Sequence, residues 1–194
     1  MATRMNQVFA AALELQAVLA ETGRPFCFIG GLALQRWGEN RFTQDADATV
    51  LTNFEFEEQV VKHLLSRFKS RRPDGKAFAL QNRVVVLEAS NGVFLDVALG
   101  ALEFEVHAVG RAIDWTLADG QSLRICTAED LVVHKAFASR DKDWLDITRI
   151  LQRQGPTLNT SRIFEELRPL VLLKEDETIL PRLEALMRKH KMLE

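Results

Sequence analysis

The stretch Ile29–Leu51, IGGLALQRWGENRFTQDADATVL, joins two short apolar runs and decides how we interpret the chain. Gly30 and Gly31 close the first run, and Asp45 and Asp47 open the second. Because side chains alternate across a strand, both aspartates would point to the same side, with Cα atoms about 6 to 7 Å apart. If the two charges were ~4 Å apart, their repulsion would be roughly 4 kcal/mol at an effective dielectric constant of about 20. We therefore expect a proton, an Arg or Lys, or a metal cation beside them.

A third carboxylate favours the metal cation. Asp96 interrupts an otherwise apolar strand candidate, VFLDVAL, and a charge in a buried strand rarely lacks a partner. If this strand lies beside the one that begins at Asp45, three carboxylates converge. Mg²⁺ or Mn²⁺ suits such a site, because it prefers oxygen ligands and completes its shell with water and phosphate oxygens. Three carboxylates can hold two cations, which activate an attacking oxygen and stabilise a leaving one.

Each feature has a plainer explanation when it is taken alone. The two aspartates of the Asp-x-Asp pair could be solvated at a strand edge, or could cap a turn and pair with Arg41. Asp96 could lie on an exposed strand face. The Gly-Gly pair could be only a tight turn, although glycine before a helix lets phosphate approach the unpaired N–H groups. No P-loop motif is present. The combination, rather than any one feature, favours a nucleotide site.

The rest of the sequence shows both helix and strand signals up to about residue 127, and only helix signals after it. Asn91-Gly92 between two β-rich runs predicts a hairpin, and Asp119-Gly120 predicts a second. Apolar residues at helical spacing predict the helices. We expect an α+β fold with a mostly antiparallel sheet, in which 1–127 form the core and 128–194 form a helical segment packed on it. The expected helices are 4–21, 32–37, 54–68, 128–139, 142–154, 161–172 and 175–189, and the expected strands are 25–29, 45–51, 83–89, 93–99, 112–118 and 122–127.

Composition excludes several classes of protein. The 194 residues carry a formal net charge of -2, so no global basic field indicates nucleic-acid binding. No apolar run approaches the ~20 residues that cross a bilayer. The N-terminal 20 residues show helical periodicity interrupted by Glu14 and Gln16, unlike an export signal. We therefore expect a cytoplasmic protein that has no membrane partner.

Taken together, the order of these motifs resembles the nucleotidyltransferase superfamily with the DNA-polymerase-β-like fold. Strand, Gly-Gly, short helix, Arg-x-Thr-x-Asp-x-Asp and a later Asp between apolar residues follow one another. RFTQDAD, Arg41–Asp47, is similar to the form in the AbiEii/AbiGii toxin branch. TAEDLVVHKAFASRDKDWLDI, Thr127–Ile147, resembles the helix pair of that branch. The resemblance covers about residues 25 to 150.

The resemblance implies a role for each motif residue. Gly30 and Gly31 would face the triphosphate, and many members have serine at the second position. Arg41 and Thr43 would contribute to nucleotide binding. The three motif aspartates would hold the divalent metal and form the catalytic set, and the third would act as a base toward the acceptor hydroxyl. These three are Asp45, Asp47 and Asp96.

Lys135 can be interpreted from its position on the predicted helix, without the resemblance. It shares a helix face with Leu131 and Ala138, so it either snorkels, forms a salt bridge or meets an anion. In the resembling branch, the lysine at this position would neutralise the triphosphate. The supporting residues would be Arg140, Asp143 and Asp146, with the two aspartates orienting Arg140 or Lys135.

The sequence-based hypothesis is a metal-dependent nucleotidyltransferase that uses a nucleoside triphosphate (NTP). The family context implies a toxin-like enzyme acting on tRNA or protein, with an antitoxin as a partner. A small-molecule acceptor such as an antibiotic is the next alternative. A catalytically silent member that binds nucleotide or a partner protein is another, and an α+β interaction domain with solvated aspartates is the last.

Overall fold

The computed structural model describes residues 2–39 and 43–193, and the chain divides into two compact units. The first unit comprises Met1–Leu32 and Arg41–Cys126, and the second comprises Ala33–Asn40 and Thr127–Glu194. The C-terminal division therefore falls where the pattern turns helical. The segment 33–40 belongs with the helical unit, although it lies early in the sequence.

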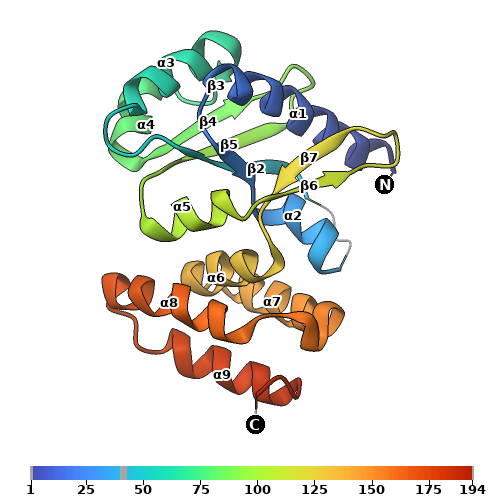
Figure 1. Cartoon of the computed structure of the whole chain (residues 1–194). Coiled ribbons are helices and arrows are strands. Elements are labelled where there is room, and N and C mark those ends of the chain that lie inside the picture. The colour runs from blue at the N-terminus through green and yellow to red at the C-terminus, as the bar shows by residue number, and fades with distance from the viewer. Residues whose placement is uncertain (1, 40–42, 194) are drawn as a thin grey trace. The chain divides into compact units, whose positions relative to one another are not determined.

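In the described part of the first unit, seven strands form one sheet in the order β3-β4-β5-β2-β1-β7-β6 (Figure 1). The pairs β1–β2, β3–β4, β4–β5 and β6–β7 are antiparallel, whereas β1–β7 and β2–β5 are parallel. The predicted α+β fold with a mostly antiparallel sheet is confirmed. The strands are β1 Phe26–Phe28, β2 Asp45–Leu51, β3 Lys69–Ser70, β4 Val84–Glu88, β5 Phe94–Gly100, β6 Ile113–Thr116 and β7 Ser122–Ile125.

Helices cover both faces of this sheet. Helix α1 packs across β2, β5 and β7, and α5 packs against β1 and β2 on the other face (Figure 1). Alternation along β2 buries Ala46, Ala48 and Val50, and leaves Asp45 and Asp47 half-buried on the opposite side. The helices that begin in this part of the chain are α1 Ala2–Glu21, α2 Gly30–Trp37, α3 Glu57–Arg67, α4 Gly75–Asn82 and α5 Glu103–Gly110.

The predicted hairpins are present, but several elements differ from expectation. In the first hairpin, Gly92 has a φ of +79° and the N–H of Ala89 donates to the carbonyl of Val93 at 2.8 Å. Strand β3 and helices α4 and α5 were not predicted from the sequence. Helix α2 begins at Gly30, not at Leu32 as expected, so the second glycine lies inside the first helical turn.

The second unit is helical. Helix α6 contacts α7, α8 and α9, and Thr127 caps α6 by accepting a hydrogen bond from the N–H of Asp130 at 3.3 Å. One prediction here is wrong: the last helix begins at Ile179, because Glu175 takes a left-handed conformation with a φ of +57° and ends α8. The elements are α6 Ala128–Ala138, α7 Asp141–Gln154, a 3₁₀ turn Gly155–Thr157, α8 Thr160–Lys174 and α9 Ile179–Lys189.

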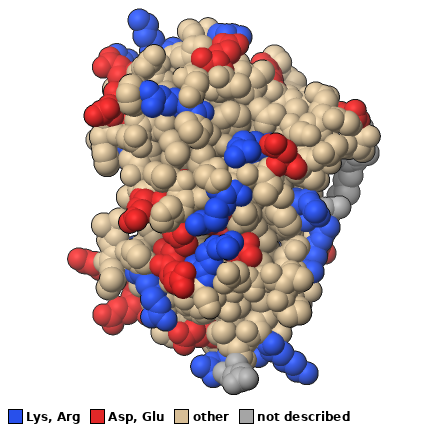
Figure 2. Space-filling model, in the orientation of Figure 1, with Lys and Arg blue, Asp and Glu red and all other residues tan. Residues whose placement is uncertain are grey.

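The surface carries both signs of charge. Figure 2 shows Lys and Arg interspersed with Asp and Glu on the face that it draws, as the net charge of -2 leads one to expect. Among residues 2–39 and 43–193, no helix combines the length and the apolar character needed to span a bilayer.

The buried centre of the sheet should dominate the stability of the first unit. Leu95 on β5 is 0% exposed, so Leu95→Ala should lower the free energy of unfolding by about 2–5 kcal/mol through the cavity it leaves. The same change at Leu172, which is 78% exposed, should cost less than about 0.5 kcal/mol. Urea denaturation of both variants measures the difference. Equal losses would contradict the assignment of the core.

Candidate active site

Three carboxylates meet at the β2–β5 boundary. The two strands are parallel, and their register places Asp47 directly opposite Asp96 and Asp45 opposite Phe94. One carboxylate oxygen each from Asp45, Asp47 and Asp96 lies within 4.8 Å of the others, and all three residues are half-buried. The condition set by the sequence, that the strand carrying Asp96 lies beside the strand that begins at Asp45, is therefore met. We call these three residues the acidic triad.

The surroundings of the triad disfavour the ionised form of Asp96. Burial raises the pKa of Asp96 above its ordinary value, and the nearby charge of Asp45 raises it further. The Arg71 guanidinium works in the opposite direction and lowers that pKa, but does not outweigh the burial. A cation bound among these oxygens would relieve the repulsion, and oxygen-only ligands are the set that Mg²⁺ prefers.

Gly30 closes one side of the triad. The backbone N–H of Ile29 donates to the carbonyl of Asp47 at 2.9 Å, which ties the end of β1 to β2 at this point. Gly30 itself has a φ of +62°, and a Cβ added there would overlap the carboxylate of Asp47. A glycine is therefore required by both backbone conformation and space. The Gly-Gly pair is more than a turn, because it makes room for an acidic side chain.

Thr43 explains why the second glycine is not a serine. A Cβ on Gly31 would overlap the hydroxyl oxygen of Thr43, which therefore occupies the space that a serine side chain would need. That hydroxyl donates to the Asp45 carboxylate at 3.0 Å. Thr43 thus brings a hydroxyl to the place between the glycine pair and the triad. Its contact with a nucleotide stays a prediction.

Lys135 lies in a buried ion-pair cluster of the helical unit. Its ammonium group is 2.7 Å from an oxygen of Asp146 and 3.5 Å from one of Asp143. Arg140 contacts Asp143 at 2.6 Å, and Arg149 approaches Asp146 at 3.6 Å. Burial would raise the pKa of Asp143, but Arg140 and Lys135 together lower it. Lys135 as a ligand of the triphosphate stays a prediction.

Arg41 and Arg71 are the two arginines associated with the candidate site. Arg41 lies outside the described residues, so its predicted role in nucleotide binding stays a prediction. Arg71 was not predicted from the sequence, and its guanidinium reaches Asp96 from the segment after β3. The signal that could have located it is the turn-forming stretch Arg72-Pro73-Asp74-Gly75, which places an Arg beside a strand end.

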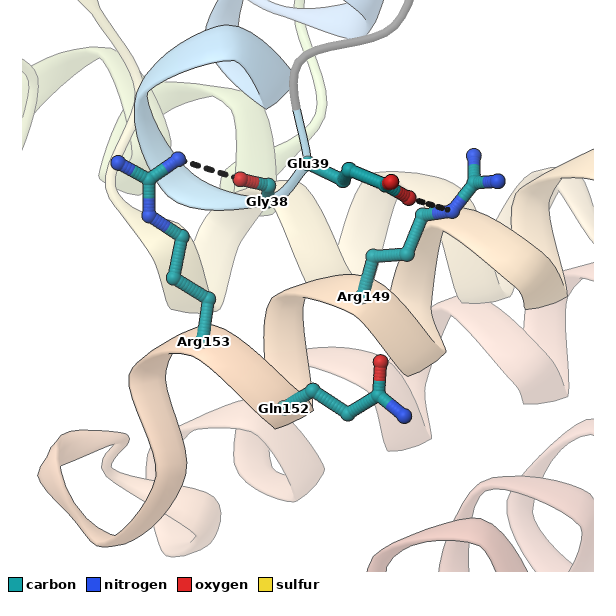
Figure 3. Close-up of a pocket in the computed structure, with 5 residues that line it drawn as sticks. All are labelled: Gly38, Glu39, Arg149, Gln152 and Arg153. Atoms are coloured by element: carbon teal, nitrogen blue, oxygen red, sulfur yellow. Dashed lines mark hydrogen bonds and ion pairs between the residues drawn. The ribbon is translucent and has the colours of Figure 1, made fainter.

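The helical unit also contains a pocket with a volume of about 490 Å³ (Figure 3). Arg149 and Arg153 on α7 reach the segment after α2: Arg149 pairs with Glu39 at 2.8 Å, and Arg153 donates to the carbonyl of Gly38. Both guanidinium groups already have protein partners. These contacts hold the segment 33–39 against α7, which accounts for the arginines without a ligand.

The sequence matches a known family over residues 12–191, described as the nucleotidyl transferase AbiEii toxin of a type IV toxin–antitoxin system. The chain belongs to this family. The match covers the acidic triad, the glycine pair and the Lys135 cluster, and the expected resemblance is confirmed. No curated protein matches the chain.

One solved structure shares the fold. The solution structure of the antibiotic-resistance factor ANT(2'')-Ia is similar, with a TM-score of 0.51 and 17% identity over 98% of this chain and 100% of that one. An antigenic nucleotidyltransferase-like protein from Paracoccidioides brasiliensis has a TM-score of 0.44 and 16% identity over 93% and 87% of the two chains. The lincosamide antibiotic adenylyltransferase LnuA has 0.44 and 11% over 70% and 91%. Only the first likeness supports the fold.

Because a side chain at position 31 would overlap that of Thr43, substitutions at these two positions should have non-additive effects on stability. Gly31→Ser should destabilise the protein by about 1–3 kcal/mol, because its side chain overlaps the Thr43 hydroxyl, although serine is the better helix former. Gly31→Ser combined with Thr43→Ala should recover most of that loss. Thermal unfolding of both single variants and of the double variant gives the double-mutant cycle. If the changes in the free energy of unfolding simply add, the two side chains do not compete for the same space.

The Lys135 cluster predicts a large stability effect. Asp146→Ala leaves a buried lysine short of its nearest counter-ion and should cost about 3–5 kcal/mol in the free energy of unfolding. Asp141→Ala on the same helix removes a fully exposed carboxylate and should cost much less. Urea denaturation measures both. A loss at Asp146 as small as that at Asp141 would contradict a buried, mutually dependent cluster.

Proposed function

We propose that this protein is a metal-dependent nucleotidyltransferase that moves a nucleoside monophosphate from an NTP to an acceptor hydroxyl. The observation that carries the proposal is the convergence of Asp45, Asp47 and Asp96 beside the glycine pair. Membership of a nucleotidyltransferase family supports the general chemistry. The metal, the nucleotide and the acceptor are the parts that we add.

The triad would hold Mg²⁺ or Mn²⁺. The donor set fits, because it is made of carboxylate oxygens within 4.8 Å of one another, and Gly30 keeps the space beside Asp47 clear of a side chain. When bound, the cation would neutralise phosphate charge and stabilise the departing pyrophosphate. In this proposal the protein contributes mainly position and charge, and forms no covalent intermediate.

The residues of the chain would divide the work. Gly30 and Gly31 would let the triphosphate approach the start of α2, where backbone N–H groups are unpaired, and Thr43 would offer its hydroxyl. The acceptor oxygen would bond to the α-phosphorus while the bond to the bridging oxygen breaks and pyrophosphate leaves. Asp96 would take the proton of the acceptor hydroxyl.

Two further residues belong to the nucleotide-binding set that the family resemblance implies. Arg41 would neutralise phosphate charge. Lys135 is the lysine that the resemblance assigns to the triphosphate, and its pairs with Asp143 and Asp146 would hold its ammonium group in place. Arg140 would in turn orient Asp143.

The family favours a toxin-like acceptor. Because its description names a type IV toxin–antitoxin system, we propose tRNA or protein as the acceptor, a cognate antitoxin as a partner and the cytoplasm as the location. A small-molecule acceptor is the second candidate, since the antibiotic-resistance factor ANT(2'')-Ia shares the fold. A catalytically silent member that binds nucleotide or a partner protein would keep the triad without turnover.

Label transfer tests the proposal. The purified protein is incubated with Mg²⁺, each α-³²P-labelled NTP in turn, and separately total RNA, total protein or aminoglycosides and lincosamides. We expect transfer that Asp47→Asn lowers by about a hundredfold or more, because a charge-stabilising group is lost. Asp119→Asn, in the β6–β7 turn, is the matched control and should transfer as the wild type does.

The labelled product would identify the acceptor class. Label in RNA or protein would support the toxin-like enzyme, and label in the antibiotic would support the second candidate. Triphosphate binding with no transfer to any acceptor would indicate the silent member. Transfer that is equal in Asp47→Asn and the wild type would contradict the assignment of the triad.

A further inference from the structure

Arg71 belongs to the same row of the sheet as the acidic triad. Its backbone N–H donates to the carbonyl of Val86 on β4 at 3.1 Å. Val86 pairs with Asp96 on β5, which pairs with Asp47 on β2. Directly paired residues present their side chains on the same face of a sheet. Arg71 therefore extends the triad's row toward β3, on the side of β2 away from the glycine pair.

The guanidinium of Arg71 is fixed at the triad by two contacts. Its Nη2 donates to Oδ1 of Asp96 at 2.5 Å, and its Cζ lies 4.5 Å from the centroid of the Phe94 ring. The side chain is 25% exposed. Its Nε is buried and has no hydrogen-bond partner among residues 2–39 and 43–193. The group thus neutralises one carboxylate from a fixed position, and its buried N–H has no acceptor among these residues.

Arg71 and a metal ion would compete for the carboxylate of Asp96. A divalent cation that binds Asp96 must share that carboxylate with a guanidinium already in contact with it, and the two positive charges repel. A triphosphate reduces this repulsion, because its negative charge offsets the charge of the added cation.

We propose that Arg71 is a positioning residue that makes cation binding at the triad depend on the triphosphate. It keeps the three carboxylates partly neutralised when no nucleotide is bound, and it weakens the binding of the free ion. When a metal–triphosphate complex enters, the phosphate charge offsets that of the cation, and the guanidinium shares Asp96 with the cation at a smaller cost. This inference rests on the proposed function of the triad.

Mn²⁺ binding tests the inference without any turnover. Free Mn²⁺ is measured by electron paramagnetic resonance during titration of the protein, with and without a non-hydrolysable NTP analogue. Arg71→Gln should bind Mn²⁺ about tenfold more tightly than the wild type in the absence of nucleotide, because a repelling charge is gone. The analogue should then strengthen Mn²⁺ binding less in Arg71→Gln than in the wild type.

A neighbouring arginine provides the matched control. Arg72 also pairs with an aspartate, Asp74 at 2.8 Å, and also lies over a ring, Phe78 at 4.4 Å, but outside the triad. Arg72→Gln makes the same change of charge and should bind Mn²⁺ as the wild type does. Arg71→Lys keeps the positive charge and should stay within about threefold of the wild type. If Arg71→Gln unfolds, Arg71→Met is the second variant, because it also removes the charge and should give the same tighter binding of Mn²⁺.

The outcomes separate this inference from the proposed function. If the wild type binds Mn²⁺ no better than Asp47→Asn, with or without the analogue, the triad is not a metal site and the proposed function fails. If the wild type binds Mn²⁺ through Asp47 but Arg71→Gln binds it equally or more weakly, only the role of Arg71 is overturned. Arg71→Lys that binds Mn²⁺ tenfold more tightly than the wild type would overturn it too.

Discussion

Repulsion among three carboxylates is the constraint on which the rest of the site depends. Parallel pairing of β2 with β5 sets Asp47 directly opposite Asp96, and Asp45 lies two residues before Asp47 on the same face. Such a cluster is costly unless positive charge is near it. The residues around the cluster accommodate it. Gly30 has no side chain and so leaves space for the Asp47 carboxylate, and the Thr43 hydroxyl donates a hydrogen bond to Asp45. Arg71 neutralises part of the charge on Asp96.

The glycine pair shows how the family motif is adapted in this chain. The resemblance implies serine at the second position in many members, yet a side chain at Gly31 would overlap the hydroxyl of Thr43. A hydroxyl is therefore still present near the triad, but it comes from the segment before β2. Contact of this hydroxyl with a nucleotide stays a prediction.

Much of the fold and of the candidate site could be predicted because the signals are local. Alternation placed Asp45 and Asp47 on one side of a strand, and Asn91-Gly92 fixed the hairpin that carries Asp96. β3 has only two residues, too few to show a period. The end of α8 depends on a left-handed glutamate, Glu175, where glycine is the usual signal.

The contact between Arg71 and Asp96 could not be predicted from the sequence. Arg71 reaches Asp96 across 25 positions of the chain, because β4 lies between β3 and β5. The contacts of Lys135 differ, because the motif after Thr127 already predicted that Asp143 and Asp146 orient Arg140 or Lys135. The packing of α6 against α7 brings Lys135 to both aspartates.

If the three carboxylates form a cation site beside a triphosphate, crystals grown with Mn²⁺ and a non-hydrolysable NTP analogue will show it through the anomalous scattering of manganese. We expect an anomalous peak in contact with oxygens of Asp45, Asp47 and Asp96, with phosphates between it and the Gly30-Gly31 pair. A bound analogue with no manganese at these carboxylates, or with manganese held elsewhere, would show that the triad is not the cation site.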